Sequence, residues 1–257
     1  MADTVKYVHD PRDHNLDAPR EIVPLLANVF QPRSVVDYGC GLGNFLYVFQ
    51  ECGVADVLGY DGDWVNHQQL YISPGHFRVT DLEQVLPDGP RADLVLCLEV
   101  AEHLSAAAAD TLVDNLVHLG DKIIFSAAVP NQGGQFHVNE QAADYWIAKF
   151  RARGFVFYDV FRERFWNNPK VNWWYKQNMF LVMHASLSPD NYLFPAYEAG
   201  IRQYIHPDLL AVHAQQASEL KQQLRRIKSG RLSLRFYLQL LKTKIATQFN
   251  RPKKQSP

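Results

Sequence analysis

Short apolar runs alternate with amphipathic stretches over the first 185 or so residues of the chain. Runs typical of buried strands lie at 34–38, 57–60, 77–79, 94–98 and 122–126, and further strands are expected at 155–161 and 178–183. Apolar residues recur at helical spacing between the runs, at 22–29, 44–52, 106–119 and 144–153. This alternation predicts an α/β fold in which a seven-stranded, mostly parallel sheet carries helices on both faces.

The pattern changes after Met183. Residues 184–205 contain Pro189 and Pro195 and are expected to form an irregular connection. Two apolar stripes at helical spacing follow, on either side of Gly230: Ala217, Leu220, Leu224 and Ile227, then Leu234, Leu238, Leu241, Ile245 and Phe249. We therefore predict one domain over 1–187 and a helical extension over 188–257 that ends in a disordered tail.

Four successive predicted strands end in an acidic residue: Asp37, Asp61, Asp81 and Glu99. In parallel sheets, ligands bind outside the carboxyl ends of the strands. Glycines 39, 41 and 43 follow the first strand and allow the backbone to approach a ligand before a helix begins. Each feature alone is typical of a turn or a helix N-cap, but together they predict a ligand site. The G-x-G-x-G spacing departs from the dinucleotide pattern G-x-G-x-x-G and disfavours an NAD(P)-dependent oxidoreductase.

The run Val36-Asp37-Tyr38-Gly39-Cys40-Gly41-Leu42-Gly43 matches the first motif of the class I methyltransferases. Over about residues 14 to 183 the chain resembles this family, which implies a Rossmann-like fold and S-adenosylmethionine as cofactor. The resemblance gives Asp61 the ribose hydroxyls as partners, and a carboxylate can accept from both at once. It places Asp81 and the Leu82 backbone near the adenine, and Glu99 at the next strand end. The cofactor-binding residues that it implies are Asp37, Gly39, Cys40, Gly41, Asp61, Gly62, Asp81, Leu82 and Glu99. Trp64 either stacks on the adenine or is an ordinary core or surface aromatic residue.

Methyl transfer to a hydroxyl needs a base beyond the strand ends. The glycine-rich loop 129–141 carries His137, Asn139 and Glu140, and a histidine there is the first candidate for that base. Alternatively, Glu140 or Asn139 caps the next helix and His137 only braces the loop.

His103 is the second catalytic candidate. It closes the run Glu99-Val100-Ala101-Glu102-His103, and a similar E-x-x-E-H run holds a divalent metal in the ubiquinone-pathway O-methyltransferases. That resemblance implies a magnesium-like site at Glu99, Glu102 and His103 as the alternative to an architectural role. We expect no metal.

A second resemblance is to methyltransferases encoded with polysaccharide-assembly enzymes. It rests on His14-Asn15, on 99–104, on 125–128, on 137–141 and on Trp173-Trp174-Tyr175-Lys176-Gln177-Asn178, and it departs at Asn131, where those relatives have glycine. The resemblance implies O-methylation of a sugar or glycan intermediate. Trp166, Trp173, Trp174 and Tyr175 offer aromatic faces that suit a sugar ring, and equally a phenolic ring or a core.

Amino-acid composition indicates the class of protein and its cellular compartment. The 257 residues are 47% hydrophobic and 21% charged, which is ordinary for a globular chain. Cys40, Cys52 and Cys97 fit neither a zinc knuckle nor a disulfide framework, and the polar residues 1–10 lack a signal-peptide pattern, so we expect a cytoplasmic protein. No run of about 18 apolar residues predicts a membrane span.

Charge is uneven although the net charge is −1: from Lys221 onwards there are eleven Lys or Arg residues and no Asp or Glu. A docked helical hairpin, on the core or on a second copy in a homodimer, is one interpretation. Peripheral membrane contact through 206–250 is another, and it would suit a lipid-linked glycan. Nucleic-acid binding is disfavoured, because no binding motif accompanies the charge.

The sequence therefore predicts an S-adenosylmethionine-dependent O-methyltransferase that acts on a sugar or glycan, with His137 as the candidate base. Two other hypotheses stay open. One keeps the cofactor and takes a small aromatic or lipid-like acceptor. The other is a non-catalytic scaffold of the same fold, which the intact acidic strand ends argue against.

Overall fold

The computed structural model describes residues 7–10, 14–86, 89–188, 204–229, 235–238 and 242. The chain divides into two compact units after His206. The first unit extends beyond the predicted boundary at residue 187, because His206 packs within it. The His206 backbone N–H donates to Gln177 Oε1 at 2.7 Å, and the His206 ring lies 4.4 Å from that of Trp166.

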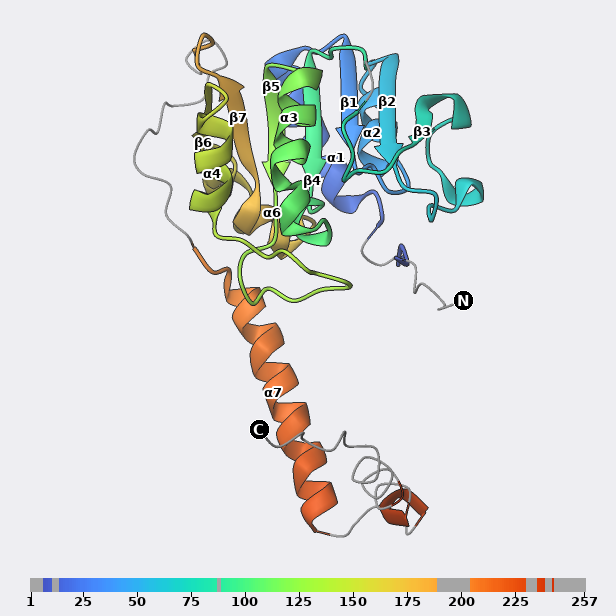
Figure 1. Cartoon of the computed structure of the whole chain (residues 1–257), viewed down its shortest axis with the longest axis vertical. Helices are drawn as coiled ribbons and strands as arrows, with labels where there is room; N and C mark the ends of the chain where they lie inside the picture. Colours follow the sequence, from blue (N-terminus) through green and yellow to red (C-terminus); the bar gives the residue numbers. More distant parts are fainter. Residues whose placement is uncertain are drawn as a thin grey trace, which may run out of the picture. The chain divides into compact units, whose positions relative to one another are not determined.

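A seven-stranded sheet forms the centre of the first unit (Figure 1), with strand order β3-β2-β1-β4-β5-β7-β6. The strands are β1 (Ser34–Tyr38), β2 (Asp56–Asp61), β3 (Phe77–Val79), β4 (Leu94–Leu98), β5 (Lys122–Ser126), β6 (Phe155–Tyr158) and β7 (Phe180–His184). Neighbouring strands are parallel, except that β7 runs antiparallel to both β5 and β6. The predicted fold class, a mostly parallel Rossmann-like sheet, is confirmed.

Helices cover both faces of this sheet. The α-helices of the first unit are α1 (Asp17–Phe30), α2 (Asn44–Glu51), α3 (Ala109–Leu119), α4 (Ala143–Arg151), α5 (Arg162–Phe165) and α6 (Trp173–Asn178). Short 3₁₀ helices lie at η1 (His67–Gln69), η2 (Pro74–His76), η3 (Ala101–His103) and η4 (Ala106–Ala108).

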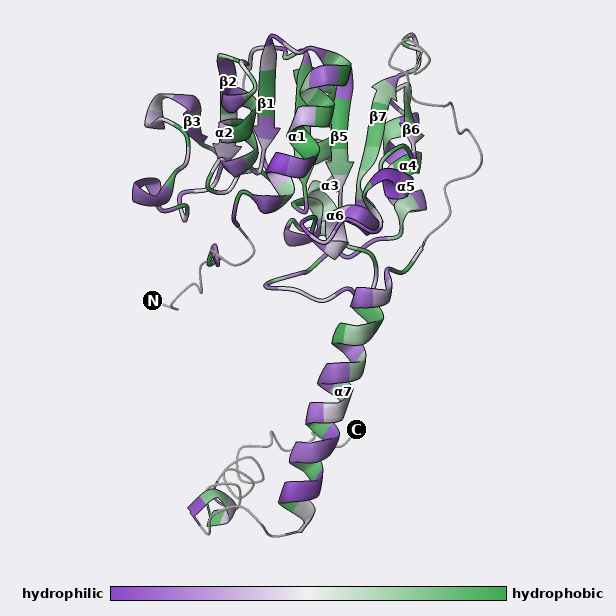
Figure 2. Ribbon diagram, turned by 180° about the vertical axis from the view of Figure 1, so that it is seen from behind, coloured by the Kyte–Doolittle hydropathy of each residue, from purple (hydrophilic) through white to green (hydrophobic). Residues whose placement is uncertain are grey.

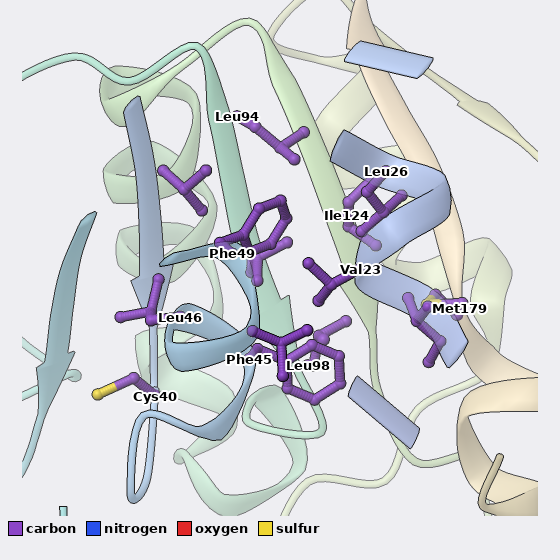
Figure 3. Close-up of a cluster of buried hydrophobic side chains, with 14 of the residues drawn as sticks. Val23, Leu26, Cys40, Phe45, Leu46, Phe49, Leu94, Leu98, Ile124 and Met179 are labelled. Carbon is purple, nitrogen blue, oxygen red and sulfur yellow. The ribbon is translucent and has the colours of Figure 1, made fainter. Parts of the chain in front are cut away.

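Successive residues of a buried strand point to opposite faces, and β4 shows this clearly. Leu94 and Leu96 join the apolar cluster under α1 and α2, part of which Figure 3 shows, whereas Val95 and Cys97 join the cluster under α3 and α4. Because both faces of the sheet are covered and exclude water at β4, a continuous apolar run forms a strand there, as the sequence predicted.

Two predicted strand boundaries shift. The strand expected from residue 178 begins at Phe180, and the strand expected to reach residue 161 ends at Tyr158. At the first of these, Gln177 and Asn178 are buried polar residues at the end of α6. Their side-chain amides need hydrogen-bond partners. The helical turn lets Asn178 donate to Glu99, and lets the Gln177 amide donate to Asn178 and accept the His206 N–H.

The second unit contains α7 (Pro207–Lys228), which carries the first predicted stripe. Figure 2 shows hydrophilic and hydrophobic residues interleaved along it, in contrast to the largely hydrophobic β5. The irregular connection at 189–203, most of the second stripe and the tail lie outside the described residues. Among the described helices, none has the length and apolar character to cross a bilayer. The predicted roles of the basic extension stay predictions.

Candidate active site

A cavity of about 1110 Å³ lies at the carboxyl ends of β1, β2 and β4. The arm 7–10, the loop 132–137 and the start of α6 complete its wall. Sites for one small ligand usually span about 300–1000 Å³. The cavity is therefore large enough for a cofactor together with an acceptor.

Most of the predicted site residues line this cavity: Asp37, Gly39, Cys40, Gly41, Asp61, Leu82, Glu99, His103 and His137. Gly62 and Asp81 do not. The exposed Asp81 side chain accepts the Glu83 N–H at 3.0 Å, an ordinary turn contact. Gly62 lies beneath Trp64, since a Cβ at this position would be 2.1 Å from the indole ring. Trp64 itself lines the cavity and is 39% exposed.

Asp61 holds the glycine turn in shape. Its Oδ2 accepts the Gly41 N–H at 2.7 Å, and its Oδ1 accepts the Gly62 N–H at 2.6 Å. The turn needs glycine in part because Gly39 has a φ of +88° and packs directly against Val100. A strand-end carboxylate therefore organises the loop in addition to facing the cavity.

The buried carboxyl groups of Asp37 and Asp61 both line the cavity at the ends of β1 and β2. Burial raises the pKa of Asp37 from 3.8 to about 7, and the proximity of Asp61 adds to the rise. Burial also raises the pKa of Asp61, to about 6, against the opposing effect of its two backbone N–H donors. Buried carboxylates without a counter-charge favour a cationic ligand.

Glu99 closes β4 in a left-handed conformation, with a φ of +54°. Its carboxyl group accepts from Gln132 Nε2 at 2.9 Å and from Asn178 Nδ2 at 3.2 Å. Non-glycine residues with positive φ persist where the surrounding structure holds them, and they cluster at functional sites. Here the two amides, from loop 127–142 and from α6, hold Glu99 at the cavity wall.

Glu102 and His103 lie next to one another on η3. Glu102 is fully buried, and burial and the neighbouring Glu99 raise its pKa well above the usual value. Burial lowers the pKa of His103 to about 4, with a further contribution from His137. His103 is therefore an uncharged imidazole at neutral pH, 4.8 Å from the His137 ring between ring centres.

The His137 side chain contacts the Glu140 carboxylate within the loop that follows β5. Its Nδ1 lies 2.9 Å from Glu140 Oε1. The same carboxylate accepts the backbone N–H groups of Asn131 and Gly133, each at 2.7 Å. No side chain caps α4, whose N-cap is Ala142, so the alternative in which Glu140 or Asn139 caps that helix is wrong.

The arm 7–10 is the part of the site that sequence reasoning missed. Val8 and the Gln135 side chain exchange two hydrogen bonds, of 3.3 and 3.2 Å, which join the arm to the loop across the cavity. His9 lies against Gly41, and Tyr7 packs 5.1 Å from His103 between ring centres. No motif marks these polar residues, because only the folded chain brings them to the cavity.

The structure groups three residues that could hold a metal ion: Glu102 and His103, which the sequence suggested, and His137 in place of Glu99. Ligand atoms of Glu102, His103 and His137 lie within 4.8 Å of one another. Glu99 is not among them, and amides hold its carboxyl group.

We expect full activity in the presence of EDTA, since the cluster offers two imidazoles and a single carboxyl group, whereas Mg²⁺ prefers a set of oxygen ligands. The measurement is initial rate after chelation and desalting. A loss that added Mg²⁺ or Mn²⁺ restores would instead assign these residues as ligands.

Gly134 supports the His137 ring from behind. A Cβ at this position would lie 2.2 Å from His137 Nε2, whereas a Cβ at Gly133 would meet nothing within 4 Å. We expect Gly134→Ala to displace the ring and lower kcat by about 10²-fold, the effect of a misplacement of roughly 1 Å.

The control is Gly53→Ala, which strains a residue with a φ of +91° by about 1–2 kcal/mol at a position that does not line the cavity and where a Cβ would meet nothing within 4 Å. It should lower thermal stability and retain most of kcat. Equal kcat for Gly134→Ala and the wild type would show that the ring has room to move.

Comparison with known proteins finds solved structures of similar fold. The sugar N-methyltransferase KedS8 from a Streptoalloteichus species has 13% sequence identity and a TM-score of 0.53, over 72% of this chain and 95% of that one. Magnesium protoporphyrin IX methyltransferase from Synechocystis, solved with S-adenosylhomocysteine, has 21% identity and a TM-score of 0.45, over 65% and 81%. At this identity the likeness is one of fold.

An O-methyltransferase family protein from Burkholderia thailandensis has 14% identity and a TM-score of 0.47. The match covers 64% of this chain and 55% of that protein, so the chain spans about half of its length. No curated protein sequence matches the chain. A family model described as a methyltransferase domain matches residues 12–179, more than half of the chain and all the strand ends around the cavity. The chain belongs to this family of methyltransferase domains, and S-adenosylmethionine is its methyl donor, as the sequence predicted.

Proposed function

We propose that the chain methylates a hydroxyl oxygen of a sugar or glycan intermediate, with His137 as the general base. The observation that carries the proposal is that His137 lines the same cavity as the glycine turn and Asp61. A base and the methyl donor would therefore share one cavity, as an in-line displacement requires.

S-Adenosylmethionine supplies an activated methyl group and leaves as S-adenosylhomocysteine. The acceptor oxygen forms the new bond to the methyl carbon as the carbon–sulfur bond breaks, and the hydroxyl proton passes to His137. The arm and the loop, joined through Val8 and Gln135, border the part of the cavity where these atoms would meet. Asp37 and Asp61 provide negative charge at the end of the cavity where a cationic cofactor is expected.

The acceptor side of the cavity favours an uncharged ring. Tyr7, Phe136, Trp173, Trp174 and Tyr175 line it, and aromatic faces suit the apolar face of a sugar. Of the residues that the structure describes, none lining the cavity is a lysine or arginine that would pair with a phosphate. We therefore place neutral glycosides ahead of nucleotide sugars among acceptors.

The test begins with calorimetric titration of S-adenosylmethionine and of NAD. Radiolabelled methyl transfer then follows to methyl glycosides, UDP-sugars, phenols and long-chain alcohols. We expect binding of S-adenosylmethionine alone and transfer to the glycosides. Turnover of phenols or alcohols only would replace the sugar with the aromatic or lipid-like acceptor, and tight cofactor binding without any turnover would favour the scaffold.

Cofactor affinity should rise with pH between about 5 and 8. A cationic cofactor needs the charged forms of Asp37 and Asp61, whose pKa values near 7 and 6 leave them mostly protonated at pH 5.

The same pKa values affect the stability of the protein without cofactor. Since they lie above the usual 3.8, the two groups stabilise the free protein most below about pH 4. That contribution is lost as pH rises through 6 to 7.

The measurement is the shift in Tm on adding S-adenosylmethionine, taken at pH 5.5 and pH 8. We expect a larger shift at pH 8 for the wild type, and a flatter pH dependence for Asp37→Asn. The same shift at both pH values would contradict the assignment of these carboxyls to the cofactor.

A further inference from the structure

We propose that Glu140 is the positioning residue of the methyl-transfer step: its carboxylate fixes the His137 imidazole in the form that carries its proton on Nδ1 and leaves Nε2 to accept the acceptor's proton. The inference rests on the proposed role of His137 as base. It adds a residue that neither the strand-end motifs nor the glycine turn contains.

Hydrogen-bond chemistry decides the tautomer. The Nδ1–Oε1 distance is 2.9 Å, and the two side chains are only 11% and 18% exposed. An ionised carboxylate has lone pairs and no proton to donate, so the ring nitrogen that faces it must be the donor. A neutral imidazole has one N–H, which leaves Nε2 with the free lone pair that a general base needs.

The Glu140 carboxylate is itself held in place. Besides His137, it accepts the backbone N–H groups of Asn131 and Gly133, so three donors converge on its two oxygens. Both of those backbone positions are left-handed, with φ values of +67° and +70°. The shape of the loop and the orientation of the ring therefore depend on one side chain.

The ring is also fixed from its other side. Gly134 packs over the ring face, since a Cβ there would lie 2.2 Å from Nε2, 2.5 Å from Cε1 and 2.8 Å from Cδ2, which is not the direction of the Nε2 lone pair. The edge of the ring meets the uncharged His103. When the imidazole takes the acceptor's proton, the adjacent carboxylate stabilises the imidazolium that forms. That arrangement lowers the barrier to proton transfer without Glu140 itself being protonated.

A double-mutant cycle separates this role from simple support of the loop. The variants are Glu140→Gln, His137→Gln and the double variant, with Glu163→Gln, an exposed residue on α5, as the matched control. We expect Glu140→Gln to lower kcat by about 10²-fold or more, within the range of a general base, with KM for S-adenosylmethionine unchanged. In the His137→Gln background the same change should have no further effect. Losses that simply multiply would overturn the proposal, because Glu140 would then act without His137.

An NMR measurement tests the same inference without any acceptor. The ¹⁵N chemical shifts of the His137 ring in the wild-type protein at pH 8 report which nitrogen carries the proton. We expect Nδ1–H in the wild type, a mixture of tautomers in Glu140→Gln, and recovery in part in Glu140→Asp, which keeps a carboxylate. A wild-type ring protonated on Nε2 would overturn the proposal, even if Glu140→Gln failed to fold.

The two proposals can fail separately. If no sugar is methylated but the His137 ring carries its proton on Nδ1, the proposed acceptor is refuted and the Glu140–His137 arrangement is retained.

Discussion

His137→Ala is expected to lower kcat by about 10²–10⁴-fold, the usual contribution of a general base, and to leave the affinity for S-adenosylmethionine unchanged. The imidazole lines the cavity beside the loop 131–134, away from the glycine turn that Asp61 organises. Removing it takes away the group that receives the hydroxyl proton, while the cofactor contacts at the strand ends persist. Steady-state rates with a saturating glycoside, together with calorimetric titration of the cofactor, separate the two effects.

The matched control for this variant is His184→Ala. His184 lies at the end of β7, where its Nδ1 contacts the Ser186 hydroxyl at 2.8 Å, and it does not line the cavity. That variant should retain the wild-type rate. Full activity of His137→Ala would remove His137 from the mechanism and leave the neutral His103 as the remaining histidine among the predicted catalytic residues.

Asp61→Asn should be nearly as damaging to cofactor binding as Asp61→Ala, although asparagine has almost the same shape as aspartate. Both carboxylate oxygens accept a backbone N–H, from Gly41 and from Gly62. An amide has one acceptor oxygen, so one of these N–H groups would face an NH₂ group instead. Leaving a buried donor unsatisfied costs about 1–3 kcal/mol, which corresponds to roughly a 5- to 150-fold loss of affinity if the cofactor-binding form of the turn is lost.

Calorimetry with S-adenosylmethionine measures this loss, and chemical denaturation measures the accompanying decrease in the free energy of unfolding. Asp56→Asn is the control, since Asp56 is an exposed residue at the other end of the same strand. Wild-type affinity in Asp61→Asn would mean that the turn holds its shape without the second acceptor and that the carboxylate does not contact the cofactor.

The strand-end positions of the site were predictable from the sequence because they depend on local rules. A short apolar run buried on both faces forms a parallel strand, and the carboxyl ends of such strands meet at one edge. Asp37, Asp61 and Glu99 therefore came together as expected. Asp81 did not reach the cavity, because its side chain turns to the Glu83 N–H two residues further along the chain.

The sequence by itself determined the sheet and the order of its acidic ends, since both follow from hydrophobic periodicity over a few residues. The family and the cofactor were implied by the resemblance of the run 36–43 to the first motif of the class I methyltransferases. The tertiary structure alone decided what surrounds the acceptor. It joined Val8 to Gln135 across 127 positions of the chain, brought Asn178 to Glu99 and buried His103 as a neutral ring. These contacts depend on where distant segments meet and on how much water they exclude. Desolvation and long-range hydrogen bonds, which leave no periodic trace in a sequence, therefore decide the chemistry of this end of the cavity.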